Sequence, residues 1–225
     1  MLADSISDLL YVSDPAGMQH LAREGVPDEN IVFVGNVMID TLLRLKERAL
    51  ASSVLEDLGV REGEFGLVTL HRPSNVDDRA MLEHLLAVLG DIAQELPLVF
   101  PVHPRTKARM EAAGIALAAP WILSPPLGYL GFMKLTATAR VVLTDSGGIQ
   151  EETTVLGVPC VTLRDNTERP VTVEEGTNFL AGTSREAILT GFRRAMAGDA
   201  SGRVPRFWDG KSAARVAEHL VSVLG

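Results

Sequence analysis

The stretch LTDSGGIQEETTVLGVPCVTLRDNTERPVTVEEGTN, residues 143–178, decides how the whole chain is interpreted. The apolar run Val141–Leu143 has the character of a buried strand, and it stops at Thr144–Gly148. The next segment, Ile149–Leu156, is typical of a helix, and Gly157 follows where a C-cap glycine would stand. A strand that passes through Ser-Gly-Gly into a helix leaves unpaired backbone N–H groups at the positive end of that helix. This arrangement commonly binds an anion, usually phosphate.

Ser146, Gly147 and Gly148 are therefore candidate anion-binding residues. The two glycines let a ligand approach the backbone closely, and the Ser146 hydroxyl can donate one further hydrogen bond. The alternative is an ordinary strand-to-helix turn in which Ser146 is the N-cap.

Two acids, Glu151 and Glu152, fall in the first turns of the predicted helix. A carboxylate one turn from a phosphate site is suited to the paired hydroxyls of a ribose, so one of the two is a candidate ribose ligand. The alternative is that both acids simply complement the helix dipole.

A second strand, Pro159–Leu163, leads into the polar loop Arg164–Pro170. Because parallel strands end on the same side of a sheet, this loop should leave the edge that carries Ser146. Arg164 and Arg169 can each bind phosphate through two parallel hydrogen bonds. An Arg–Glu pair within the loop is the alternative, and it competes more strongly for Arg164 than for Arg169. Together these features predict a site for a nucleotide diphosphate.

Strands alternate with helices along the rest of the chain, which predicts an α/β fold with a Rossmann-like parallel sheet and helices on both faces. The expected strands are residues 9–13, 31–34, 67–70, 98–102, 122–123, 141–143, 159–163 and 179–181. The expected helices are residues 15–24, 37–50, 79–95, 106–113, 129–137, 149–156, 185–196 and 213–224. Asn36 is expected to cap the helix that starts at residue 37.

Composition limits the possible partners. The 225 residues are 46% hydrophobic and 22% charged, with a net charge of −8, which argues against binding to nucleic acid or anionic membrane. The single cysteine, Cys160, cannot form an internal disulfide, and no apolar run has membrane length or signal-peptide form, so we expect a cytoplasmic protein. No residue set has metal-ligand spacing and there is no G-x-G-x-x-G fingerprint, so neither a metal nor NAD is predicted.

The runs LTDSGGIQEE, GVPC, LRDNTERP and EEGTN, in this order and spacing, resemble the C-terminal half of UDP-N-acetylglucosamine 2-epimerases of the non-hydrolysing type. The resemblance extends along nearly all of the chain. It implies half of a two-domain, glycosyltransferase-B-like architecture. Residues 1–40 would be the remnant of a first Rossmann-like domain with its crossover. Residues 41–225 would be the UDP-binding domain, including the C-terminal helix. Most of the first domain, with the acidic catalytic residues of the family, would lie outside this chain.

The resemblance also implies a reaction. The family converts UDP-N-acetylglucosamine to UDP-N-acetylmannosamine: the C2 proton is removed as UDP leaves, and UDP then adds back to the unsaturated sugar. Relatives are often dimers and supply precursors of surface polysaccharide, so a homodimer is expected. The alternatives are a glycosyltransferase or a hydrolysing epimerase with the same UDP pocket, and a non-catalytic module that binds nucleotide sugars.

The LHRPSN stretch that ends the strand 67–70 carries His71 and Arg72. A histidine that titrates near neutrality beside an arginine could protonate or stabilise a phosphate leaving group. The alternative is a satisfied histidine at a strand end, with Ser74 or Asn75 capping the next helix. The resemblance implies that His71 and Arg72 belong to the active site. Family members with a regulatory substrate site tend to have HRREN here, and the departure in this chain casts doubt on activation by substrate.

The resemblance adds two more candidate residues for the nucleotide site. The resemblance places His103 near the nucleotide and Phe132 beside the uracil. The alternative for His103 is a loop histidine braced by two prolines, and the alternative for Phe132 is plain core packing.

Overall fold

The computed structural model describes residues 2–199 and 202–225. By its internal contacts the chain divides into two compact units, one formed by residues up to 45 together with 204–225, and the other by residues 46–203. The domain division expected from the sequence, with its boundary at residue 40 and the C-terminal helix in the second domain, stays a prediction.

The larger unit is built on a six-stranded sheet in which every strand pairs in parallel with its neighbours. The strand order is β5-β4-β3-β6-β7-β8. The strands are β3 (Gly66–Thr69), β4 (Leu98–Pro101), β5 (Trp121–Ser124), β6 (Val141–Thr144), β7 (Cys160–Thr162) and β8 (Asn178–Leu180). The predicted parallel sheet is therefore confirmed.

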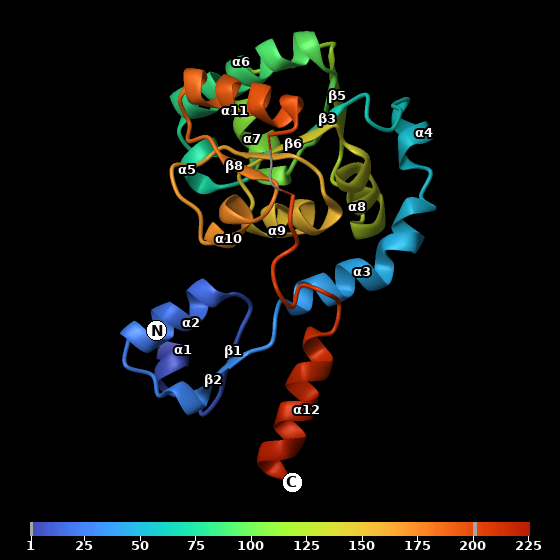
Figure 1. Ribbon diagram of the computed structural model, residues 1–225. Helices are drawn as coiled ribbons and strands as arrows, with labels where there is room; N and C mark the ends of the chain where they lie inside the picture. The colour runs from blue at the N-terminus through green and yellow to red at the C-terminus, as the bar shows by residue number, and fades with distance from the viewer. Residues whose placement is uncertain (1, 200–201) are drawn as a thin grey trace. The chain divides into compact units, whose positions relative to one another are not determined.

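Helices cover both faces of this sheet (Figure 1). They are α4 (Val54–Leu58), α5 (Pro73–Val76), α6 (Arg79–Glu95), α7 (Pro104–Ala113), α8 (Tyr129–Thr138), α9 (Gly147–Leu156), α10 (Pro170–Glu174) and α11 (Arg185–Ala197). Figure 1 shows α6 and α11 on one side of the sheet and α8 and α9 on the other. Within the part of the chain that the structure describes, no helix is long and apolar enough to cross a membrane.

The two faces follow from the two-residue period of the strands. In β6, Val141 and Leu143 pack into the core under α6 and α11, whereas Val142 packs into the core under α8 and α9. Successive side chains of a strand point to opposite faces, so a strand buried on both faces must be apolar at every position. This is why the strands appear in the sequence as continuous apolar runs.

The order of the strands in the sheet opens a space at the carboxyl ends of the central strands, β3 and β6. From β3 the chain moves outward through β4 to β5, and it then returns to place β6 on the other side of β3. The connections that follow β3 and β6 therefore turn to opposite faces. In parallel α/β sheets a crevice opens at such a point, beyond the carboxyl ends of the strands, and ligands bind there.

Four short α-helices were not predicted from the sequence, namely α1 (Leu2–Ser5), α4, α5 and α10. Each has one turn or little more, which is too short to establish an apolar period of 3.6 residues. Two of them begin at a proline, Pro73 and Pro170, which fits the first helical position because its missing N–H would have no partner there.

The smaller unit contains a two-stranded parallel sheet of β1 (Leu10–Val12) and β2 (Ile31–Phe33). Its helices are α1 (Leu2–Ser5), α2 (Pro15–Arg23), the 3-10 turn η1 (Asp28–Asn30), α3 (Val37–Leu50), which runs across the division at residue 45, and α12 (Ser212–Leu224). Asn36 caps α3 as predicted, because its Oδ1 accepts the Met38 N–H at 2.9 Å.

Side-chain hydrogen bonds hold the C-terminal segment in the smaller unit. Asp40 accepts the N–H groups of Ser212 and Ala213, at 3.1 and 2.7 Å, and so caps the start of α12. The buried Trp208 donates its indole N–H to the Ser13 carbonyl at 2.9 Å. These bonds explain why residues 204–225 cluster with the beginning of the chain.

The packing of α6 generates a test of the core. Leu89 is fully buried in the cluster between α6 and the sheet, whereas Gln94 on the same helix is exposed. We expect Leu89→Ala to lower the free energy of unfolding by about 3 kcal/mol, because the substitution removes buried methyl groups and leaves a cavity. Gln94→Ala should change it by less than about 0.5 kcal/mol. Urea titration followed by circular dichroism measures both, and equal effects would contradict the assigned face.

Candidate functional site

A cavity of about 360 Å³ opens at the carboxyl ends of the strands. We call it the edge cavity. It is lined by Thr69, Leu70, His71, Pro101, His103, Pro126, Leu127, Phe132, Ser146 and Ile149. Four predicted site residues therefore come together from three different strand ends and from α8: His71, His103, Phe132 and Ser146.

One wall of the edge cavity is apolar. Leu127, Phe132 and Ile149 line the cavity and also pack against the core cluster beneath α8 and α9. Phe132 thus both lines the cavity and packs against the core, and its place beside the uracil stays a prediction. A flat apolar wall of this kind can hold a planar base.

The start of α9 forms the polar wall. Ser146 is extended and stands at the N-cap position, but its side chain makes no capping hydrogen bond. A Cβ atom built on Gly148 would meet nothing within 4 Å, and one built on Gly147 would have Glu168 Oε2 as its nearest neighbour at 3.9 Å. The backbone N–H groups at this positive helix end are therefore open to an approaching anion.

Asp145 lies beneath this turn, and its side chain has no exposed surface. Its Oδ2 accepts the backbone N–H groups of His71 at 3.0 Å and Arg72 at 2.9 Å, and it also accepts the Asn75 amide at 3.3 Å. Its Oδ1 lies 3.0 Å from the ring Nδ1 of His71. The carboxylate at the end of β6 thus orients the loop that follows β3. Sequence analysis missed its role.

Asn75 is the second buried link between strand ends. Its Nδ2 also donates to the Leu163 carbonyl at 3.0 Å, beyond the end of β7. The expectation that Ser74 or Asn75 would cap the next helix is wrong for α6, because Asp78 caps it and accepts the Met81 N–H at 2.7 Å. Asn75 instead donates to the Asp145 side chain after β6 and to the Leu163 backbone carbonyl after β7.

Glu168 contacts two arginines, Arg164 of its own loop and Arg72 of the loop after β3. It accepts two hydrogen bonds from the buried Arg164, at 2.9 and 2.7 Å, and it lies 3.3 Å from Arg72 Nη2. The Arg–Glu pair within the loop is therefore the interpretation that holds for Arg164. Hydrogen bonding from Arg164 lowers the pKa of Glu168 to about 2 despite its exposure. Arg72 is held further by donating its Nε–H to the Asp145 carbonyl at 3.0 Å.

Arg169 pairs outside its loop. Its Nε lies 2.5 Å from Oε1 of Glu151, whose side chain is 7% exposed, and its Nη1 donates to the Glu168 carbonyl at 3.2 Å. Glu151 therefore anchors the arginine to α9. Neither residue lines the edge cavity.

A buried polar network fixes the loop that carries Glu168 and Arg169. Gln150 Oε1 accepts the Thr167 hydroxyl at 2.6 Å and the Asn178 amide at 3.1 Å, while its Nε2 donates to the Ser146 carbonyl at 3.2 Å. One glutamine on α9 thus links the turn at residues 146–148, the loop and the start of β8.

Glu152 lies one residue further along α9 and accepts the Tyr129 hydroxyl at 3.3 Å. Its Oε2 is buried without a hydrogen-bond partner. Burial raises the pKa of Glu152 to about 7, against the lowering effect of the Tyr129 hydrogen bond. Burial likewise raises the pKa of Tyr129 to about 12. Glu152 is therefore poised between its neutral and charged forms near neutral pH.

His71 and His103 stand together in the edge cavity, with ring centroids 5.7 Å apart. The hydrogen bond to Asp145 raises the pKa of His71, while burial opposes the shift. His103 Nδ1 accepts the Arg105 N–H at 3.2 Å, which leaves its Nε2 as the donor when the ring is neutral.

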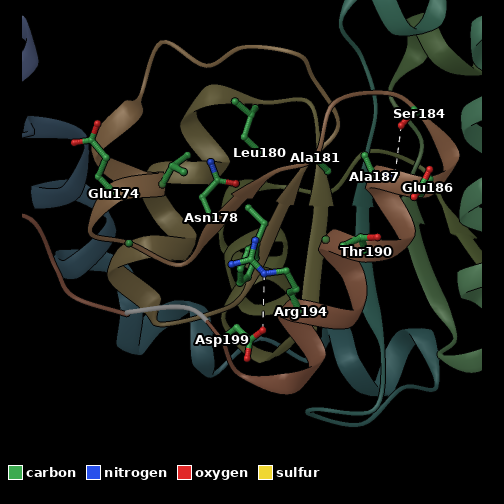
Figure 2. A pocket seen from close by; sticks show the side chains of 14 residues that line it. Glu174, Asn178, Leu180, Ala181, Ser184, Glu186, Ala187, Thr190, Arg194 and Asp199 are labelled. Atoms are coloured by element: carbon green, nitrogen blue, oxygen red, sulfur yellow. Dashed lines mark hydrogen bonds and ion pairs between the residues drawn. The ribbon is translucent and has the colours of Figure 1, made fainter.

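A second cavity of about 600 Å³ lies along β8 and α11, and we call it the β8 cavity (Figure 2). Among the described residues that line it, Arg194 is the cation, and it pairs with Asp199 at 3.8 Å and lies over the Phe179 ring. Glu174 and Glu186 add two further carboxylates. This negative balance is unfavourable for a diphosphate, and no predicted site residue lines the cavity.

The fold and the edge cavity define the class of protein: a Rossmann-like α/β chain of the glycosyltransferase-B kind, with a crevice at the switch point of its sheet. The family model described as UDP-N-acetylglucosamine 2-epimerase matches residues 1–221. The chain therefore belongs to the UDP-N-acetylglucosamine 2-epimerase family.

Individual relatives agree with this assignment. The chain is 36% identical over 234 residues to the UDP-N-acetylglucosamine 2-epimerase of Methanocaldococcus jannaschii, which covers 98% of this chain and 62% of the relative. It is 35% identical over 226 residues to the UDP-2,3-diacetamido-2,3-dideoxy-D-glucuronate 2-epimerase of Pseudomonas aeruginosa, covering 99% and 62%. The crystal structure of the M. jannaschii enzyme in complex with UDP-GlcNAc and UDP matches 98% of this chain and 63% of its own, with a TM-score of 0.89 and 34% identity. The chain thus spans about three fifths of the length of these relatives.

The titration of Glu152 generates a prediction. Its pKa is raised from 4.5 to about 7 in the folded chain, so the folded state binds this proton more tightly than the unfolded state. The resulting stabilisation is complete below pH 4.5 and is lost as the pH rises through 7. Glu152→Gln keeps a neutral side chain at every pH. We therefore expect the variant to gain unfolding free energy relative to the parent chain between about pH 5 and pH 8.

Urea titrations at several pH values measure this difference. Glu62→Gln, which alters an exposed carboxylate between α4 and β3, is the matched control and should show no comparable trend. A flat difference between Glu152→Gln and the parent chain would contradict the burial of an unpartnered carboxylate oxygen.

Proposed function

We propose that this chain is the UDP-binding part of a UDP-N-acetylglucosamine 2-epimerase. The observation that carries the proposal is the edge cavity, in which two histidines, an apolar wall and an open helix N-terminus meet at the switch point of the sheet. Its family membership and the solved complex of the M. jannaschii relative with UDP-GlcNAc and UDP support the same ligand.

The ligand would lie along the edge in a fixed order. The uracil would rest against Phe132, and the ribose hydroxyls would bond to the unpaired oxygen of Glu152. The diphosphate would take the N–H groups of Gly147 and Gly148. The Ser146 hydroxyl would donate another hydrogen bond to it.

Three side chains would complete the diphosphate site. Arg169 would keep the contact of its Nε with Glu151 and offer its remaining N–H groups to the diphosphate. Arg72 would add positive charge from the loop after β3. His103 would donate its Nε2–H. His71 would face the leaving phosphate, where a proton on the ring would stabilise the departing UDP.

The reaction would proceed by elimination and re-addition. A base removes the C2 proton while the C1–O bond breaks and its electron pair leaves with UDP, which gives an unsaturated sugar. UDP then adds back at C1 and a proton is delivered to the opposite face of C2. Donors aimed at the diphosphate stabilise it most when charge builds on it, so they lower the barrier as well as binding the ligand.

The base for the C2 proton would come from outside the edge cavity. Among the described residues that line the cavity, none is a carboxylate. In the family the acidic catalytic residues belong to the first domain, so the chain of 225 residues would bind UDP and lack the base.

Two sugars are candidates for the other half of the substrate. Relatives of 36% and 35% identity carry the names of two different UDP-sugar 2-epimerases. What the names share is the nucleotide and inversion at C2. A second candidate substrate is therefore a diacetamido sugar acid attached to UDP.

Composition and family resemblance support proposals about the location and the macromolecular partners of the chain. The net charge of −8 supports a protein that does not bind nucleic acid, and the single buried cysteine suits the cytoplasm. A homodimer is proposed from the family resemblance alone.

Gly148→Ala tests the anion-binding turn. A Cβ atom at this position meets no protein atom within 4 Å, so the folded chain should accept it without loss of stability. The added methyl group should obstruct a phosphate that approaches the backbone, and we expect UDP affinity to fall about tenfold or more in calorimetric titration, equivalent to about 1.4 kcal/mol.

The matched control is Gly90→Ala in α6, where the added Cβ also meets nothing within 4 Å. This variant should leave UDP affinity unchanged. Equal affinities for all three chains would mean that the diphosphate does not approach the start of α9.

The absence of a cavity carboxylate gives a second expectation. The purified chain should bind UDP but convert UDP-N-acetylglucosamine to UDP-N-acetylmannosamine at a rate near that of buffer alone, as followed by proton NMR. Robust epimerisation by this chain would contradict the assignment of the base to residues outside it.

A further inference from the structure

The buried carboxylate of Asp145 is surrounded by hydrogen-bond donors. The groups that face it are the backbone N–H groups of His71 and Arg72, the side-chain amide of Asn75 and the ring Nδ1 of His71. Three of these four groups can only donate at this contact, and a carboxylate can only accept. The fourth, Nδ1 of His71, must therefore carry its proton to fit this arrangement.

The second ring nitrogen of His71 then has a defined state. With a proton on Nδ1, the neutral ring has an unprotonated Nε2, and this nitrogen belongs to a side chain that lines the edge cavity and is 41% exposed. His103 has the opposite form, because its Nδ1 accepts the Arg105 N–H. The cavity thus pairs one histidine that can take up a proton at Nε2 with one that already donates from Nε2.

The charged groups around His71 favour that uptake. Asp145 supplies a negative charge from the end of β6, and its hydrogen bond raises the pKa of His71. Arg72 opposes this, although its guanidinium also faces the carboxylate of Glu168. His103 is the titratable group from the β4 side, and α9 contributes no titratable side chain to the cavity wall.

We infer that Asp145 is a positioning residue for His71: it fixes the ring proton on Nδ1 and supports a second proton on Nε2 when a diphosphate enters the edge cavity. The identity of the ligand rests on the proposed function. The second proton comes from the solvent, so binding of UDP takes up a proton. Affinity is highest below the pKa of His71 in the free chain, and it falls as the pH rises from that pKa to the higher pKa of His71 in the ligand complex.

The ring state can be read directly without ligand. Long-range nitrogen–proton NMR spectra of the unmodified chain should give the Nδ1–H form for His71 above its pKa. His84 is the internal control, because its Nε2 lies 2.9 Å from the Thr183 carbonyl and should carry the proton. An Nε2–H form for His71 would overturn the inference, whatever the behaviour of any variant.

Asp145→Asn tests the same contact by substitution. The amide retains the shape but removes the charge, so the pKa of His71 should fall relative to the parent chain, while the ring signals of His84 stay as they are in the parent chain. An unchanged pKa of His71 in a folded variant would overturn the role of Asp145. If the variant does not fold, the tautomer measurement on the unmodified chain still decides.

The ligand arm uses UDP itself. Calorimetry in two buffers of different ionisation heat should show that UDP binding to the parent chain takes up protons. The His71→Gln variant controls for titration of the UDP phosphate and should take up fewer protons. Near pH 6 the affinity of this variant for UDP should be about tenfold lower than that of the parent chain, as for the loss of a charge-assisted hydrogen bond. Equal uptake by the two chains would overturn the inference. UDP that does not bind would contradict the proposed function instead, while the histidine spectra still decide the role of Asp145.

Discussion

The site depends on one buried carboxylate. Asp145 has no exposed surface and receives hydrogen bonds from two backbone amides and two side chains of the loop after β3. A buried carboxylate without partners would cost several kcal/mol, so these donors cannot move away from it independently. Asn75 extends the constraint to the Leu163 carbonyl beyond β7. Three neighbouring strand ends are thereby tied into one rigid edge, and the His71 ring is held in place by the same contact that holds the backbone.

Around this rigid centre the charges are arranged in pairs that leave donors free. Arg164 is buried and satisfied by Glu168, which makes it structural, whereas Arg72 and Arg169 are only partly engaged and partly exposed. The Gln150 network holds the loop between them against α9. An anion that reaches the start of α9 would therefore meet preformed donors, so the proposed loss of UDP would need little reorganisation as charge grows on the diphosphate. Glu152, whose pKa is raised to about 7, is the group in this arrangement that changes its charge near neutral pH.

Much of this could be predicted from the chain alone, and the exceptions have physical causes. The strand β6, the turn at Ser146–Gly148 and the helix after it follow from local rules, because apolar runs, glycine and helix ends act over a few residues. The convergence of His71, His103 and Phe132 was expected from parallel topology and from family resemblance. The roles of Asp145 and Asn75 could not be predicted from the sequence, because their hydrogen-bond partners lie 70 or more residues away along the chain. A charged residue directly after a four-residue buried strand was the one available signal. The pairing of Arg169 with Glu151 depends on loop geometry that no periodicity encodes.

The proposed function requires the nucleotide diphosphate to bind at the strand ends that Asp145 ties together. Titration of the isotope-labelled chain with UDP, followed by amide and histidine NMR signals, tests it most directly. We expect saturable shifts that are largest at the amides of Gly147 and Gly148 and at the His71 ring, while the signals of residues that line the β8 cavity stay unchanged. Shifts concentrated at Arg194 and along β8, with none at the start of α9, would contradict it.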